Sequence, residues 1–291
     1  MMSSRNDRNF NTTSMTRVLV PEEISILVSS NPNQGAQNVS ADGSTFQIQL
    51  QDGIKVPADA KNVTVSVEEA TVWWVVPNII TGQNDTFYIT APDTSDVLTN
   101  YISVIPQGLY DLSGLNNALL RDLENQGAKI NPEPVLSLSP DDATQKVNIR
   151  TNYIGVSIDF TPNNTPREIL GYDAQVYGPA TQAPQNFLAP NVAQFNQVNY
   201  FLIHSDLVNT GLRLNDDYNQ TIAQVLIDVA PGSQIVSTPF HPAKTNAPEL
   251  AGAIRTTLRF QLTDDQNRPV NTNGEYWSAR ILISYLHAHN I

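Results

Sequence analysis

Histidines are the residues with the widest chemical repertoire in this chain, because it contains four of them and no cysteine. Without cysteine there is no thiolate nucleophile, no thiolate metal ligand and no disulfide. The segment His204-Ser205-Asp206 contains the residue types of a hydrolytic triad. Consecutive side chains of a strand point to opposite faces, so these three residues cannot form a relay. We therefore predict no catalytic residues.

A second pair, His287 and His289, would share one face of a strand because the two residues are two positions apart. Two imidazoles at this spacing can bind a transition metal, but the sequence indicates no third ligand. The polar run that includes Asp264, Asp265 and Glu275 resembles a calcium loop in composition only, since its spacing does not fit the EF-hand pattern. We predict solvated tail residues and a polar hairpin turn, and no metal site.

Other motifs that could bind a ligand are absent from the sequence or fit a structural role. Gly114 and Gly127 belong to no phosphate-binding pattern, and nothing selects a pair of carboxylates for glycoside hydrolysis. The pair Trp73-Trp74 has the chemistry of a carbohydrate platform, but its valine neighbours favour a core position. We therefore predict no cofactor.

The charge of the chain limits its partners. The net charge is −12 over 291 residues, and only 15% of the residues are charged. An acidic surface repels nucleic acid, so we expect no specific nucleic-acid binding. A neutral polar surface suits large contact areas, because few charges must be desolvated on assembly.

The N-terminal stretch differs from the rest, because Arg5, Arg8 and Arg17 face only Asp7 there. Residues 1–17 are either a solvated terminus or an arm that orders against a neighbouring subunit. The stretch lacks a long apolar region, so we expect no signal peptide and no secretion. No apolar run in the chain is long enough for a transmembrane helix.

Short β-rich runs separated by turn residues dominate the chain, which is typical of a sandwich or barrel. Pro21 interrupts the first run, and Asp52-Gly53 is expected to form the turn that ends the second. The strands are expected at 17–28, 44–50, 62–76, 86–90, 101–105, 135–138, 147–150, 154–160, 199–204, 221–229, 253–263 and 276–286.

The middle of the chain has a different pattern. Leucines recur at helical spacing between residues 112 and 123, which predicts an amphipathic helix over 112–125. Thr165-Pro166-Arg167-Glu168 has the pattern of a capping box for a helix of about one turn. Residues 173–197 are rich in Pro, Gln and Asn and are expected to form a loop, either a contact-forming one or a linker.

The segment Leu258–Tyr285 resembles the closing hairpin of jelly-roll capsid proteins from virophages and Polinton-type elements, of the adenovirus-like lineage. In that family a strand leads through a Pro-Val and an Asn-Gly-Glu sequence into the last strand. The pair Asn267-Arg268 departs from the glycine-bearing turn of the family. Three further stretches share the resemblance in order and spacing: Ile105–Tyr110, Ile169–Tyr172 and Tyr200–Val208. Within this lineage the chain most resembles the penton, or vertex, proteins.

The resemblance implies a mainly β chain with a single antiparallel jelly-roll β-sandwich and an inserted, mixed β domain that carries one amphipathic helix. The jelly roll would comprise residues 18–91 and 198–287, the insertion domain and Pro-rich loop residues 92–197, and the N-terminal arm residues 1–17. The arm and the loop at 173–197 would then be candidates for contacts between subunits.

The function that the resemblance implies is structural. A homopentamer of the chain would occupy the fivefold vertices of an icosahedral virion, contact the major capsid protein and be made and assembled inside the host cell.

Three other functions compete with this interpretation. The first is a trimeric, double jelly-roll major or minor capsid protein, which the helix and hairpin in the middle of the chain disfavour. The second is a receptor-binding spike module. The third is a β-sandwich hydrolase, which the missing nucleophile constellation disfavours.

Overall fold

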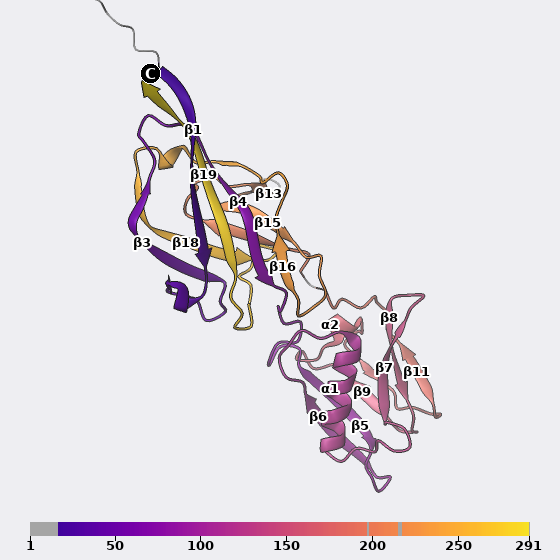
Figure 1. Cartoon of the computed structure of the whole chain (residues 1–291). Coiled ribbons are helices and arrows are strands. Elements are labelled where there is room, and N and C mark those ends of the chain that lie inside the picture. The colour runs from indigo at the N-terminus through magenta and orange to yellow at the C-terminus, as the bar shows by residue number, and fades with distance from the viewer. Residues whose placement is uncertain (1–16, 197, 215–216, 291) are drawn as a thin grey trace, which may run out of the picture.

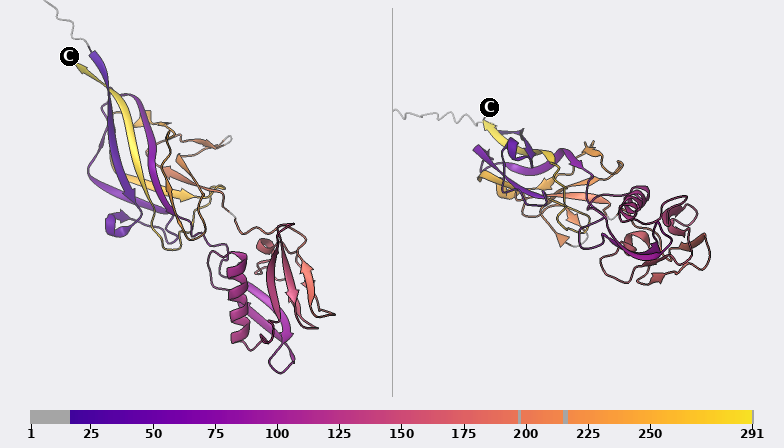
Figure 2. Two further views of the ribbon diagram at one scale, coloured as in Figure 1. Left: turned by 45° about the vertical axis from the view of Figure 1, so that its right-hand side comes forward. Right: turned by 90° about the horizontal axis from the view of Figure 1, so that it is seen from below.

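A computed structural model describes residues 17–196, 198–214 and 217–290. The chain forms two bodies that follow one another along a long axis, and most of it consists of antiparallel strands (Figure 1). The described C-terminal end lies at the end of the larger body that is farthest from the smaller body (Figure 2). No helix in the described part of the chain is both long and apolar enough to cross a membrane.

Two sheets build the larger body. The first has the order β1-β19-β4-β16, and the short β17 also pairs with β4. Its strands are β1 (Arg17–Ser29), β4 (Lys61–Trp73), β16 (Gln234–Ser237), β17 (Thr245–Asn246) and β19 (Ser278–Asn290). The second has the order β15-β12-β18-β3-β2. Its strands are β2 (Ala36–Gln37), β3 (Thr45–Lys55), β12 (Tyr200–Ser205), β15 (Thr221–Leu226) and β18 (Ile254–Thr263).

The strand order identifies the larger body as a jelly roll. When its eight main strands are numbered along the chain, one sheet reads 1-8-3-6 and the other 5-4-7-2. This order results from two Greek keys folded over each other, with the first and last strands side by side. The fold class that the resemblance implied is confirmed.

Aromatic residues fill the space between the two sheets. Phe46 stacks on Phe260 with ring centroids 5.5 Å apart and meets Trp277 edge to face at 5.0 Å. All three side chains are fully buried. In β18, Leu258, Phe260 and Leu262 point inward at every second position, which is the alternation expected of a half-buried strand. The sandwich interior is therefore a packed core.

The smaller body lies between β4 and β12 in the sequence and contains two small sheets. One has the order β10-β9-β5-β6, with β5 (Thr86–Pro92), β6 (Leu98–Val104), β9 (Ser157–Asp159) and β10 (Val176–Tyr177). The other has the order β11-β8-β7, with β7 (Leu136–Asp141), β8 (Lys146–Thr151) and β11 (Gln185–Leu188).

The described residues also form short elements outside these four sheets. They are α2 (Arg167–Leu170), two 3₁₀ turns (Pro32–Gln34 and Pro248–Leu250) and the hairpin of β13 (Arg213–Leu214) and β14 (Asp217–Tyr218).

Helix α1 (Leu112–Asn125) packs against β6 and β7, and its bounds match the prediction (Figure 1). The Asp111 side chain accepts a 2.6 Å hydrogen bond from the backbone N–H of Gly114 and so caps the start of the helix. The buried face of the helix consists of Leu115, Ala118, Leu119 and Leu123. These residues belong to a second hydrophobic cluster, separate from the sandwich core.

Residues 86–91 were expected in the jelly roll, and this assignment is wrong. They form β5, which pairs with β6 and β9, and Phe87 and Ile89 lie in the second cluster. The change of core occurs after Trp74, which packs in the sandwich, and before Ile79, which packs in the smaller body. A short alternating strand fits either core equally well, so its pattern does not reveal its partner.

Two turn predictions are also wrong. Asp52-Gly53 does not end a strand: β3 continues to Lys55, Gly53 has φ 65°, and the register with β18 shifts at this point. The pair therefore forms a bulge, which uses the same residue types as a turn. Pro21 does not interrupt β1, because β19 is its only partner among the described strands and an edge strand tolerates a missing donor.

The predicted capping box and loop differ from the structure as well. Thr165 Oγ1 donates to the carbonyl of Pro162 at 3.0 Å instead of capping α2, and Pro166 occupies the cap position. The segment 173–197 is not an uninterrupted loop, since it contains β10 and β11. Residues 1–16 of the expected N-terminal arm lie outside the described residues.

The two separate cores predict separate unfolding. We expect Phe46→Ala to destabilise the sandwich by about 3–5 kcal/mol, and Leu119→Ala to destabilise the smaller body by about 2–5 kcal/mol, through cavities in their own cores. Urea unfolding, followed by Trp fluorescence and by far-UV circular dichroism, should resolve two transitions. Each variant should lower the midpoint of one transition only. Equal shifts of both transitions in both variants would show a single cooperative unit.

Candidate functional site

The outer edge of the first sheet is formed by β1, which has no partner on its free side among the described strands. Leu27 on this strand is 69% exposed, and the side chains of Val18, Leu19 and Val20 are also exposed. An edge strand presents unpaired N–H and C=O groups, and adjacent exposed apolar side chains mark an interaction surface. We call Leu27 and residues 18–20 the β1 edge.

The opposite side of the sandwich carries a second apolar surface. Its edge strands are β16 in the first sheet and β15 in the second. Leu226 at the end of β15 and Val236 on β16 are 63% and 56% exposed. In the loop that follows β16, Phe240 is 91% exposed, and its ring meets that of the neighbouring His241 edge to face. We call Leu226, Val236 and Phe240 the β15/β16 edge.

The smaller body also exposes apolar residues. Leu98, Ile102 and Val104 of its edge strand β6 are each more than half exposed. Gln126, at the end of α1, donates a 3.0 Å hydrogen bond to the backbone carbonyl of Ile102, so one group of this edge is already paired. Ile154 is 66% exposed in the connection before β9.

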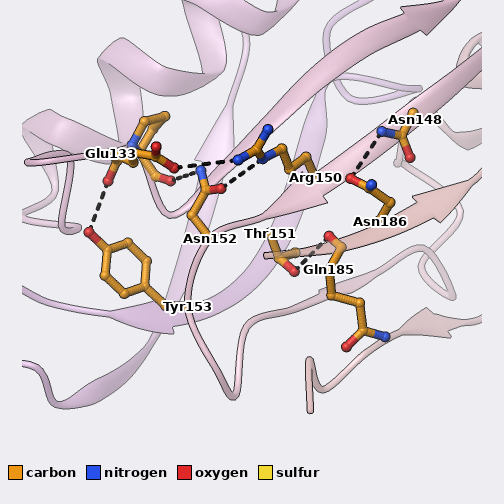
Figure 3. A network of polar contacts seen from close by, with 9 residues as sticks. Glu133, Asn148, Arg150, Thr151, Asn152, Tyr153, Gln185 and Asn186 are labelled. Atoms are coloured by element: carbon orange, nitrogen blue, oxygen red, sulfur yellow. Dashed lines mark hydrogen bonds and ion pairs between the residues drawn. The ribbon is translucent and has the colours of Figure 1, made fainter. Parts of the chain in front are cut away.

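Neutral amide side chains lie next to Arg150 around β8 and β11: those of Asn148, Asn152, Gln185 and Asn186 (Figure 3). Asn148 Nδ2 donates to Asn186 Oδ1 at 3.3 Å across the two strands, and Arg150 Nε donates to Asn152 Oδ1 at 3.0 Å. The nearest carboxylate to Arg150, that of Glu133, is 3.8 Å away and half exposed. These groups pair with each other and leave few charges to desolvate, which suits a contact surface.

His204 has a structural environment. Its Nε2 lies 2.8 Å from Thr263 Oγ1 on β18, and its Nδ1 lies 3.0 Å from Thr221 Oγ1 on β15. Burial lowers the pKa of His204 to about 4, so the ring is neutral near pH 7. Its neighbour Asp206 instead accepts a 2.9 Å hydrogen bond from the backbone N–H of Arg259. His204 and Asp206 therefore tie neighbouring strands together, and no carboxylate of the described chain orients the imidazole.

The oxygen-rich run after β18 shapes a hairpin connection. Asp264 Oδ1 accepts hydrogen bonds from the backbone N–H groups of Gln266 and Arg268, each at 2.9 Å, and its Oδ2 accepts one from Arg268 Nε at 2.7 Å. Asn271 Oδ1 likewise accepts from the backbone of Asn273 at 2.9 Å. These oxygens are engaged in turn hydrogen bonds rather than directed at a common point.

The Trp73-Trp74 pair forms no exposed platform. Trp74 is buried in the sandwich core and Trp73 is half-buried at the end of β4.

The structure brings a third side chain to His287 and His289. Glu22 of β1 places its Oε1 2.8 Å from His289 Nε2 and 3.4 Å from His287 Nδ1. The other nitrogen of His287, Nε2, lies 3.4 Å from Asp59 Oδ1. The pKa of Glu22 is lowered, first by its hydrogen bond with His289 and also by one with Tyr285. Sequence reasoning missed Glu22 because it lies 265 positions from His287.

Known proteins offer only a distant comparison. No family model matches the chain, and no curated protein matches it. Among solved structures, the chain is similar to the mavirus penton protein, with 12% identity and a TM-score of 0.46, over 91% of this chain and 100% of that one. It is also similar to a chain of the Sputnik virophage, with 12% identity and a TM-score of 0.40, over 90% and 97% of the two chains. Both TM-scores are below 0.5, so the strand order rather than this likeness establishes the fold.

The buried His204 predicts a loss of stability in acid. The folded chain keeps this ring neutral down to about pH 4, whereas the unfolded chain protonates it near pH 6.5. Its contribution is therefore fully present above pH 6.5 and is lost as the pH falls towards 4. The free energy of unfolding, measured with urea at a series of pH values, should fall less steeply over this window in His204→Asn than in the wild type. The difference in slope should correspond to the uptake of up to about one proton on unfolding. The exposed His241→Asn is the control and should follow the wild type. Parallel curves for wild type and His204→Asn would rule out the assigned role of burial.

Proposed function

We propose that this chain is a structural capsid protein of an icosahedral virus and forms a homopentamer at the fivefold vertices of the shell. One observation carries the proposal: a single jelly roll with a filled interior exposes apolar side chains along two opposite edges. Such a subunit is suited to binding copies of itself side by side.

Other uses of the jelly roll fit this chain less well. The fold also occurs in cupins and lectins. A cupin holds its ligand between the sheets, and here Phe46, Phe260 and Trp277 occupy that space. A lectin needs an exposed binding platform, and Trp74 is buried. The described residues contain one jelly roll, which also disfavours a double jelly-roll capsid protein.

The two edges suit a ring. A heterologous contact joins two different surfaces of neighbouring subunits, and repetition around one axis closes a ring. The β1 edge and the β15/β16 edge lie on opposite sides of the sandwich, as such a contact requires. Each contact would bury on the order of 1,000 Å² or more. Phe240 is the natural anchor, because aromatic residues are enriched in the cores of interfaces, where a few side chains carry most of the binding energy.

The resemblance of the sequence to virophage penton proteins supports five as the number of subunits and the major capsid protein as the surrounding partner. The division into a jelly roll, an insertion and an N-terminal arm belongs to the same proposal. The function is architectural rather than catalytic, in the virion after assembly inside the host cell. The acidic net charge of −12 supports a shell component that does not bind nucleic acid.

A receptor-binding spike module is the second candidate, and the 91% exposed Phe240 also suits it. A spike module would bind glycans or cell surfaces saturably as an isolated chain. A ring subunit would instead bind other copies of itself through the same loop.

The mass of the purified full chain in solution tests the proposal. Light scattering after size exclusion should report about 160 kDa, which is five chains of 32.0 kDa. A stable trimer would contradict the pentamer and favour the trimeric alternative. A monomer that is also absent from purified particles would contradict the capsid role.

Substitutions at the two edges test the ring geometry. We expect Leu27→Lys and Val236→Lys each to weaken the pentamer by about 100-fold or more, because a charge must be desolvated in the contact. Sedimentation at several concentrations measures the effect. Ile154→Lys is the matched control, since Ile154 is equally exposed but lies on the smaller body. Dissociation by the control but not by the edge variants would place the contact on the smaller body.

A further inference from the structure

We propose that Glu22, His287 and His289 bind a divalent transition-metal ion such as Zn²⁺, with Asp59 orienting His287. The inference does not depend on the proposed capsid role, because it rests only on the geometry of the paired first and last strands.

The register of β1 and β19 places the three ligands on one face. Glu22 lies opposite Tyr285, Val20 opposite His287 and Val18 opposite His289. Directly opposite residues of an antiparallel pair share a face, as do residues two apart on one strand. The carboxylate of Glu22 and both imidazoles therefore project to the same side of the sheet, as a result of the backbone alone.

The distances suit a metal ion. The ligand atoms of the three residues all lie within 4.8 Å of one another. Ligands of a tetrahedral zinc at about 2.0–2.1 Å are themselves separated by about 3.3 Å. The separations of 2.8 Å and 3.4 Å between Glu22 Oε1 and the two ring nitrogens lie on either side of this value. Small side-chain rotations would bring the three atoms around one ion, and water would complete the coordination.

Asp59 gives His287 the tautomer that a ligand needs. Its Oδ1 lies 3.4 Å from His287 Nε2, on the side of the ring away from Glu22. If Nε2 carries the proton for this carboxylate, Nδ1 presents its lone pair to the ion. Metal-bound histidines commonly donate their second ring N–H to a carboxylate in this way.

Access and charge also favour a cation. The side chains of Glu22, His287 and His289 are 32%, 27% and 48% exposed, so an ion can enter from solvent without unfolding. Two carboxylates face two imidazoles at this site, in a chain with a net charge of −12. A divalent cation would balance the negative charge of the two carboxylates.

The histidine pair lacked a third ligand in the sequence, and the third ligand comes from the opposite end of the chain. Coordination would fasten β1 to β19 near their ends, where the two strands extend beyond the rest of the sandwich (Figure 2). The metal ion would thus cross-link the first and last described strands of the sandwich.

Zinc titration of the full chain tests the site. After treatment with a chelator and dialysis, isothermal titration calorimetry should show one Zn²⁺ bound per chain with a micromolar or lower Kd. Glu22→Gln and the double variant His287→Asn/His289→Asn should each weaken this affinity by more than 10-fold. Asp59→Asn should weaken it by about 10-fold, as loss of an orienting carboxylate does. His241→Asn, an exposed histidine elsewhere, is the matched control and should bind as the wild type does.

A spectroscopic signal separates this site from weak surface binding. Co²⁺ in place of Zn²⁺ should give the visible absorption of a low-coordinate His/carboxylate site, and Glu22→Gln should abolish it. An unchanged zinc affinity in the double histidine variant, or no binding by the wild type, would overturn the proposal and leave the cluster an ion pair only. Circular dichroism checks folding, and if the double variant fails to fold, the near-isosteric Glu22→Gln and Asp59→Asn decide the question.

Discussion

The pairing of β1 with β19 is the contact on which the rest of the sandwich depends. Thirteen consecutive residue pairs join the first described strand to the last one, from Arg17 with Asn290 to Ser29 with Ser278. This pairing completes the first sheet. It also seats Trp277, just before β19, where its backbone N–H donates to Ser30 Oγ at 2.9 Å and its ring meets Phe46. The closed core, the free edge of β1 and the histidine cluster all follow from it.

The smaller body can be inserted between β4 and β12 without disturbing the pairing of β1 with β19, because β4 ends and β12 begins at the same end of the sandwich. Asn78 fastens the junction: its side chain donates to the carbonyls of Tyr110 and Phe195 at 2.7 Å and 3.2 Å and accepts from the backbone N–H of Tyr110 at 2.9 Å. A polar side chain that is only 3% exposed and fully paired costs little to bury. Beside it, a cleft of about 250 Å³ lies between the two bodies, lined by residues that include Trp74, Phe195 and Arg268. The insertion thus has its own core and a short, specific attachment.

The sequence predicted those parts of the fold that depend on local patterns. Helix α1 was predictable because its leucines recur at helical spacing and Asp111 can cap it. Strand β18 was predictable because its apolar residues alternate. The jelly-roll class came from the resemblance, since no local pattern identifies the partner of a strand, and the order of the strands came from the structure.

The failures have physical reasons. Strand β5 has a pattern that fits either core, and Asp52-Gly53 suits a bulge as well as a turn. The two histidines were visible as a pair with a shared face, but Glu22 became their neighbour only through the register of β1 and β19. Likewise, single exposed apolar residues are unremarkable in a sequence, and the two apolar edges appear only when the sheets are assembled.

The long-range pairing of β1 and β19 also determines when the molecule can fold during its synthesis. A ribosome releases β1 before β19, so the apolar face of the first sheet stays incomplete until β19 has been made. The smaller body is a continuous segment, and all its strands and its helix are available much earlier. A truncated chain therefore lacks the neighbour of both β1 and β4 and cannot present the sandwich edges in their final arrangement. Synthesis of β19 therefore has to precede any contact that depends on the final arrangement of those edges.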